Sequence, residues 1–110
     1  MQRLFVYGTL APGRANHGIL RDIPGSWQTA TLRGTLLDEG WGAGMGCPGI
    51  VPDANGDEVA GYVLASEQLE AHWSRLDAFE GEGYTRVPVT VRIDATLEVE
   101  AYVYALKRDG

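Results

Sequence analysis

Regular alternation of apolar and polar residues near the C-terminus constrains the fold of this chain most. From Val87 to Ile93 every second residue is apolar, which is the period of a strand with one buried face. After a turn at residues 94–96 the same alternation returns from Val99 to Ala105. The pattern predicts a β-hairpin, in which Pro88 marks an irregular or edge position.

One segment has a helical period instead. Leu69, Trp73 and Leu76 recur at helical spacing. Ser66 is a good N-cap residue before them, and Gly81 is a stop signal after them. The sequence therefore predicts one amphipathic helix that begins at Ser66 and ends near residue 80.

Further strands are expected at residues 4–6, 34–37 and 59–65. The last of these is apolar on both faces, which favours a central position in a sheet. One helix among several strands predicts an α+β fold. At 110 residues, a single domain with one core over residues 1–110 is expected.

Glu80 stands at an unusual place on the predicted helix. At 3.6 residues per turn it falls within about 20° of Leu69, on the apolar stripe. An ionised carboxylate there is costly unless it is paired, hydrogen-bonded or exposed in a cavity. Three interpretations stay open: the helix frays at residue 79, Glu80 pairs with Arg75 or Arg86, or partial burial raises its pKa for general acid/base work.

The N-terminal strand leads into Tyr7-Gly8-Thr9-Leu10. Gly8 permits a tight turn or the close approach of a ligand. Successive amides in such a turn can bind a carboxylate or phosphate oxygen. An ordinary strand-to-loop turn explains the same residues, and neither a P-loop nor a dinucleotide-binding motif follows.

Other reactive residues form no recognisable motif. The two histidines and one cysteine lack metal-ligand spacing, so no metal site is expected. Neither Ser26 nor Ser66 lies in the Gly-x-Ser-x-Gly setting of serine hydrolases. The glycine-rich segment 40–46 fits either a floppy surface loop or an adaptable flap over a substrate.

Composition narrows the classes of partner. The net charge is −6 without any basic run, which argues against nucleic acid or an anionic membrane as a partner. No apolar stretch approaches the length of a transmembrane helix, and the N-terminus enters the first strand without room for a signal peptide. A cytoplasmic protein is expected, and its oligomeric state stays open.

Five segments together resemble one family. Residues 7–10 resemble the Y-G-[ST]-L signature of the gamma-glutamylcyclotransferase-like superfamily, and residues 12–20 are similar to the stretch that follows it in the gamma-glutamylamine cyclotransferase branch. The remaining matches are the Pro-Gly element at 47–51, the L-D-x-[FY]-E block at 76–81 with 84–86, and the closing strand at 101–104. The resemblance implies a small mixed-strand β-barrel flanked by one main helix and short helical turns.

The resemblance also implies a reaction. The alpha-amine of a gamma-glutamyl group attacks its own gamma-carbonyl, which expels an amine and leaves 5-oxoproline, without metal or cofactor. Glu80 is then the general acid/base. The amides of Tyr7, Gly8, Thr9 and Leu10 would hold the glutamyl end, and each such donor typically contributes on the order of 3 kcal/mol.

Tyr84 is a further substrate-binding residue by this resemblance, or else an aromatic that faces the barrel. Only residues 81–83 separate it from Glu80, whereas some relatives carry a longer insertion. The leaving-group side of the site is therefore open to differ from that of those relatives. A non-catalytic module that binds a gamma-glutamyl or oxoproline-like ligand is the alternative function. The sequence does not identify the leaving amine.

Overall fold

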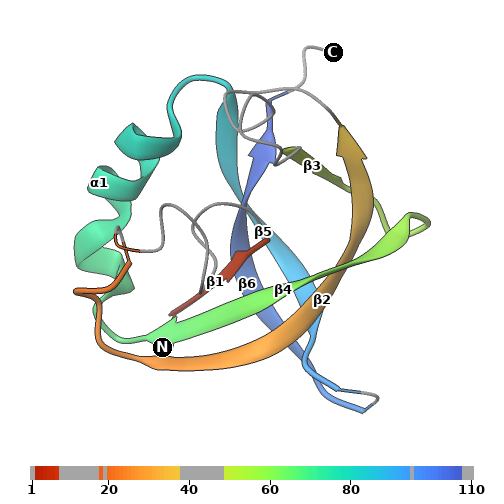
Figure 1. Cartoon of the computed structure of the whole chain (residues 1–110), viewed down its shortest axis with the longest axis horizontal. Helices are drawn as coiled ribbons and strands as arrows, with labels where there is room; N and C mark the ends of the chain where they lie inside the picture. Colours follow the sequence, from red (N-terminus) through yellow and green to blue (C-terminus); the bar gives the residue numbers. More distant parts are fainter. Residues whose placement is uncertain (1, 8–17, 19, 38–48, 95, 108–110) are drawn as a thin grey trace.

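The computed structural model describes residues 2–7, 18, 20–37, 49–94 and 96–107. Over these ranges the chain forms six strands and one helix (Figure 1). In chain order they are β1 (Gln2–Val6), β2 (Ser26–Leu37), β3 (Gly49–Pro52), β4 (Asp57–Ser66), α1 (Leu69–Glu80), β5 (Tyr84–Arg92) and β6 (Glu98–Leu106).

Five of the described strands close into a barrel in the order β2-β4-β1-β6-β5. The β1–β6 pair is parallel and the others are antiparallel, so the barrel is mixed. Thr31 of β2 lies opposite Arg92 of β5, and this pairing closes the ring. Strand β3 pairs antiparallel with residues 34–37 of β2. Helix α1 lies against one side of the barrel (Figure 1). The predicted α+β barrel with one main helix is confirmed.

The predicted hairpin is confirmed as β5 and β6, paired from Tyr84 opposite Leu106 to Arg92 opposite Glu98. Among the described residues, no β2 residue stands opposite Pro88, so the missing N–H of the proline interrupts no ladder on that edge. Strand β4 pairs with both β1 and β2, which confirms its central place.

Strand β2 was predicted only at residues 34–37, which was too short. Its exposed face is polar, and pairing with β4 holds the chain extended from Ser26.

The predicted N-cap is wrong. The residue before the helix is Gln68, and α1 begins at Leu69. Ser66 is the last residue of β4, opposite Gln2 in β1, and is 2% exposed. Its hydroxyl donates to the Pro24 carbonyl and accepts from the Gln68 N–H at 3.0 Å. Strand pairing therefore keeps Ser66 in β4, two residues before the N-cap, while its hydroxyl still accepts a backbone N–H just before the helix, as a capping residue does.

Two apolar clusters share the barrel wall, because successive side chains of a strand point to opposite faces. On β1, Leu4 and Val6 face α1, whereas Phe5 faces the inside of the barrel. The helix-facing core consists of Leu4, Val6, Leu20, Ile23, Leu64, Leu69, Trp73, Leu76 and Tyr104. The barrel core consists of Phe5, Ala30, Leu32, Ile50, Val59, Val63, Val91, Ala101 and Val103.

Candidate active site

Glu80 is the last residue of α1. Leu69, Trp73 and Leu76 on the same helix are buried, as the predicted stripe requires. Gly81 ends the helix with φ of 81°, a left-handed conformation that suits glycine, and its N–H donates to the Asp77 carbonyl at 3.0 Å. The helix therefore extends through Glu80 and does not fray at residue 79.

The Glu80 carboxyl is half-buried at the end of the helix-facing core. Burial raises its pKa from 4.5 to about 7. A carboxyl group with that pKa takes up and releases a proton readily near neutral pH, which is the property of a general acid/base. The two arginines considered as partners for it each bind another carboxylate: Arg86 binds Asp77 at 3.0 Å, and Arg75 binds Asp22 at 3.2 Å.

Tyr7 directly follows β1 and links three segments through its hydroxyl group. The hydroxyl donates to the Tyr104 carbonyl of β6 at 3.1 Å and accepts from the Ile50 N–H of β3 at 2.9 Å. Its ring stacks on Phe5 with centroids 6.2 Å apart. These contacts fix Tyr7 directly after the end of β1. Gly8, Thr9 and Leu10, the other predicted substrate-binding residues, lie outside the described residues, as does segment 40–46.

Sequence reasoning did not assign a site role to Tyr104 or to Asp77. The Tyr104 phenol lies on the α1 side of β6 and donates to Asp77 at 2.6 Å. Burial first, and then the Asp77 and Glu80 carboxylates, raise the pKa of Tyr104. Tyr104 therefore interacts with two of the predicted site residues: its carbonyl accepts from the Tyr7 hydroxyl, and its phenol lies within the electrostatic reach of Glu80. The partial signals for this pair were the position of Asp77 at the edge of the helix stripe and that of Tyr104 in the closing strand.

Tyr84 begins β5, just after the turn that ends α1. Its side chain is partly buried and packs against the helix-facing core, as does that of Phe79, and its N–H donates to the Gly81 carbonyl at 3.3 Å. Tyr84 also lines an open depression of about 670 Å³. The residues around that depression are Asp77, Ala78, Gly81, Glu82, Tyr84, Thr85, Arg86 and Tyr104.

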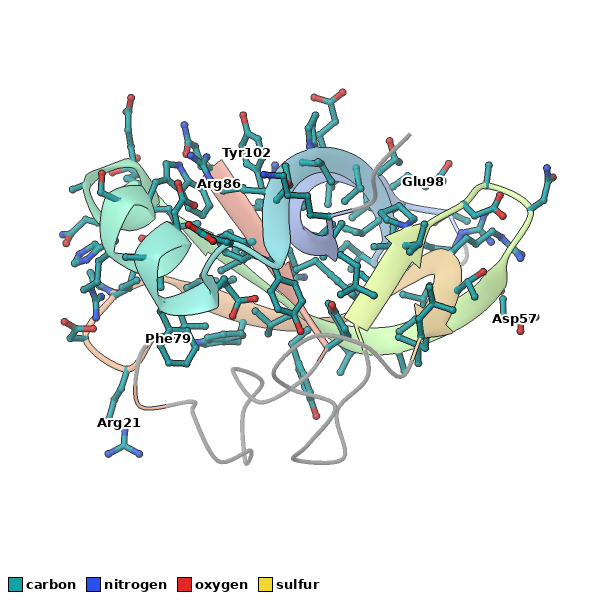
Figure 2. All side chains as sticks on the ribbon, turned by 90° about the horizontal axis from the view of Figure 1, so that it is seen from above. Arg21, Asp57, Phe79, Arg86, Glu98 and Tyr102 are labelled. Atoms are coloured by element: carbon teal, nitrogen blue, oxygen red, sulfur yellow. The ribbon has the colours of Figure 1, made fainter. Side chains whose placement is uncertain are left out.

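Figure 2 shows how the labelled residues lie around this region. Phe79 projects from the end of α1, while Arg86 and Tyr102 lie on another side of the same helix. Within the described ranges, His, Cys, Asp and Glu side chains form no group of three or more that suits a metal ion. The one helix among these residues is too short and too polar to cross a membrane.

Residues 4–110 match the family described as gamma-glutamyl cyclotransferase, AIG2-like. The gamma-L-glutamyl-butirosin B gamma-glutamyl cyclotransferase of Niallia circulans is 33% identical over 87 residues, which cover 78% of this chain and 52% of that protein. The chain thus spans about half the length of this curated relative.

Solved structures share the fold. YkqA from Bacillus subtilis superposes with a TM-score of 0.71 at 27% identity, over 96% of this chain and 35% of that one. An AIG2-like protein from Mus musculus has the same TM-score at 25% identity, over 100% of this chain and 80% of that one. Since the family match covers nearly the whole chain, this protein belongs to the AIG2-like gamma-glutamyl cyclotransferase family.

Proposed function

We propose that this protein is a cyclotransferase that converts a gamma-glutamyl amide into 5-oxoproline and a free amine. One observation carries the proposal: a half-buried carboxyl group at the end of α1, with its pKa raised to about 7, in a chain of this family. The cyclotransferase named among its relatives supports the same reaction class.

Glu80 is the proposed general acid/base. Its carboxylate accepts a proton from the substrate's alpha-amine as the nitrogen forms a bond to the gamma-carbonyl carbon. When the gamma C–N bond breaks, the same carboxyl group gives that proton to the departing nitrogen. Protons balance over the two steps, and a pKa near the working pH makes both transfers efficient.

The turn at residues 7–10 is proposed to bind the glutamyl end through its amides, because preformed dipoles stabilise charge without reorganisation. The support is the anchoring of Tyr7, whose hydroxyl is held between β3 and β6. Tyr84 is proposed as a substrate contact, since it starts the strand that follows Glu80. Cyclisation is intramolecular, so a site that holds the substrate folded removes much of the entropic barrier.

The test is release of 5-oxoproline from a panel of gamma-glutamyl amides. The panel contains a gamma-glutamyl amino acid, a gamma-glutamyl alkylamine, gamma-glutamyl-epsilon-lysine and gamma-L-glutamyl-butirosin B, the compound in the name of the Niallia circulans relative. We expect release from at least one compound. We also expect kcat/KM to fall about tenfold per pH unit below pH 7, as Glu80 takes up a proton.

Glu80→Gln keeps the size of the side chain and removes the acid/base function, so kcat should fall by about 10²–10⁴-fold. The matched control is Glu70→Gln, which removes an exposed carboxylate from the first turn of the same helix and should leave kcat unchanged. Equal activity of Glu80→Gln and wild type would remove Glu80 from the mechanism. Binding of 5-oxoproline without release from any substrate would favour the non-catalytic module.

A further inference from the structure

Three side chains from three elements meet at the last turn of α1. The Asp77 carboxylate of α1 accepts a hydrogen bond from the Tyr104 phenol of β6 at 2.6 Å. Arg86 of β5 donates to the same carboxylate through Nε at 3.0 Å and through Nη2 at 3.4 Å. Both carboxylate oxygens are held, and the end of the helix is therefore tied to the β5–β6 hairpin.

Arg86 is held from a second direction as well. Its guanidinium lies 4.3 Å from the centroid of the Trp73 ring and 5.2 Å from that of Tyr102. Figure 2 shows Arg86 and Tyr102 beside one another next to α1. A guanidinium stacks on aromatic faces and keeps its charge at every physiological pH. A positive charge thus stays beside Asp77 whatever the state of other groups.

The charge on Asp77 matters because of its place on the helix. Asp77 and Glu80 are three residues apart, which makes them neighbours on the helix surface. An ionised carboxylate disfavours the ionisation of a close neighbouring carboxyl where no cation balances its charge. Burial would raise the pKa of Asp77, but the hydrogen bonds from Tyr104 and Arg86 and the Arg86 charge lower it, so Asp77 stays ionised beside Glu80.

We propose that Asp77, Arg86 and Tyr104 are positioning residues for Glu80. Their contact fixes the last turn of α1 against the hairpin, and the Arg86 guanidinium cancels the Asp77 charge that would otherwise act on Glu80. Tyr104 gives its single phenolic proton to Asp77 and therefore donates none to a substrate. This inference rests on the proposed role of Glu80 as the acid/base.

Charged and titratable groups reach this turn from α1 itself, from the turn after it and from strands β5 and β6. Strand β1 also contacts α1, through the apolar Leu4 and Val6 and through the uncharged Gln2, whose side-chain oxygen accepts from the Trp73 indole N–H. The groups that carry charge or titrate here are Asp77 of α1, Glu82 after it, Tyr84 and Arg86 of β5, and Tyr104 of β6. Of these, Arg86 supplies the positive charge.

A charge cycle tests the proposal through the titration of Glu80 itself. The carboxyl carbon of Glu80 is followed by ¹³C NMR and assigned by the loss of its signal in Glu80→Gln. Arg86→Gln leaves the Asp77 charge uncancelled and should raise the pKa of Glu80 by about 0.5–1 unit. Asp77→Asn should lower it by about 0.5 unit, because the Arg86 charge is then unbalanced. The double variant Asp77→Asn/Arg86→Gln and the single variant Arg86→Lys should both restore the wild-type titration.

Arg33→Gln is the matched control. Arg33 pairs with Glu58 between β2 and β4, where both side chains are 51% exposed. Asp57, the chain neighbour of Glu58, lies at the opposite end of the molecule from α1 in Figure 2. The net charge changes by the same amount but at the far end of the molecule from α1, where salt screens it, so the Glu80 titration should not move. Equal shifts in Arg33→Gln and Arg86→Gln, or no shift in either, would overturn the proposal.

A second readout separates this proposal from the proposed function. In Arg86→Gln the acid limb of kcat/KM should move to higher pH together with the NMR titration.

Tyr104→Phe keeps the ring and removes the donor, and kcat should fall about tenfold while KM changes little. If wild type releases no 5-oxoproline, the proposed function fails, but the NMR cycle still decides the coupling. If Arg86→Gln does not fold, an unchanged titration in Asp77→Asn overturns the coupling.

Discussion

The barrel core and the helix-facing core are built on the same strands, yet they bury different kinds of side chain. The barrel core is apolar throughout, and Phe5, Val91 and Val103 in it are at most 1% exposed. The helix-facing core contains Trp73 and Tyr104, and it borders carboxylates at the end of α1. The alternation of strand side chains lets one wall stabilise the fold on one face and hold titratable groups on the other.

The difference also shows where ionisable groups can lie in this fold. Inside the closed barrel a carboxylate would lose its hydration without a partner, at a high cost in free energy. At the end of the helix, burial is partial, so Glu80 keeps access to protons while its pKa rises. The edge of the helix-facing core is therefore the place where stability and acid/base chemistry are compatible.

The largest predicted effect on stability comes from a substitution in the barrel core. Phe5→Ala should lower the free energy of unfolding by about 3–5 kcal/mol, measured by urea denaturation, because it empties a fully buried site. Leu36→Ala, at a residue that is 43% exposed, is the control and should cost less than about 1 kcal/mol. If Phe5→Ala also moves the pKa of Glu80 as far as Arg86→Gln does, the two cores are not independent.

A second prediction uses the pH dependence of stability. The folded-state pKa of Glu80 is about 7 and its ordinary value is 4.5. Between these values the folded chain binds more protons than the unfolded chain, so this group lowers stability as the pH rises through that window. Glu80→Gln should therefore be more stable than wild type at pH 8, by up to about 3 kcal/mol.

The same comparison at pH 4 supplies the internal control. There Glu80 is mostly protonated in both states, and the variant and wild type should unfold at similar denaturant concentrations. Glu70→Gln, exposed on the first turn of α1, should show no such pH-dependent gain. A gain in Glu80→Gln that is the same at pH 4 and pH 8 would mean that burial of the charge is not its source.

The smallest predicted effect concerns the link between the two regions. Tyr7→Phe removes the hydroxyl that satisfies the Ile50 N–H and binds the Tyr104 carbonyl. The free energy of unfolding should fall by about 1–3 kcal/mol, since a part-buried amide loses its partner.

Tyr62→Phe is the matched control for this link. The Tyr62 ring is half-buried against the helix-facing core, and the described part of the chain offers its hydroxyl no hydrogen-bond partner. The change should therefore stay within about 0.5 kcal/mol. Equal costs for the two tyrosine variants would show that the Tyr7 hydroxyl is not a structural link.

Local pattern was sufficient for much of the fold. The two-residue period predicted the β5–β6 hairpin, the doubly apolar run predicted the central place of β4, and Gly81 marked the end of α1. Local pattern failed where pairing with a residue distant in the sequence sets the end of a strand. Ser66 stays in β4 because it pairs with β1, and β2 extends back to Ser26 because it pairs with β4.

Residue spacing was enough to place Glu80 on the apolar face of a helix that reaches residue 80, because that face follows from the positions of neighbouring residues. The depth at which the carboxyl is buried and the charges around it depend on the packing of α1 against the strands. Tyr104 and Arg86 reach Asp77 across 27 and 9 residues of chain, and no local period encodes such contacts. A pKa depends on desolvation and on the charges nearby, and both exist only once the helix packs on the barrel.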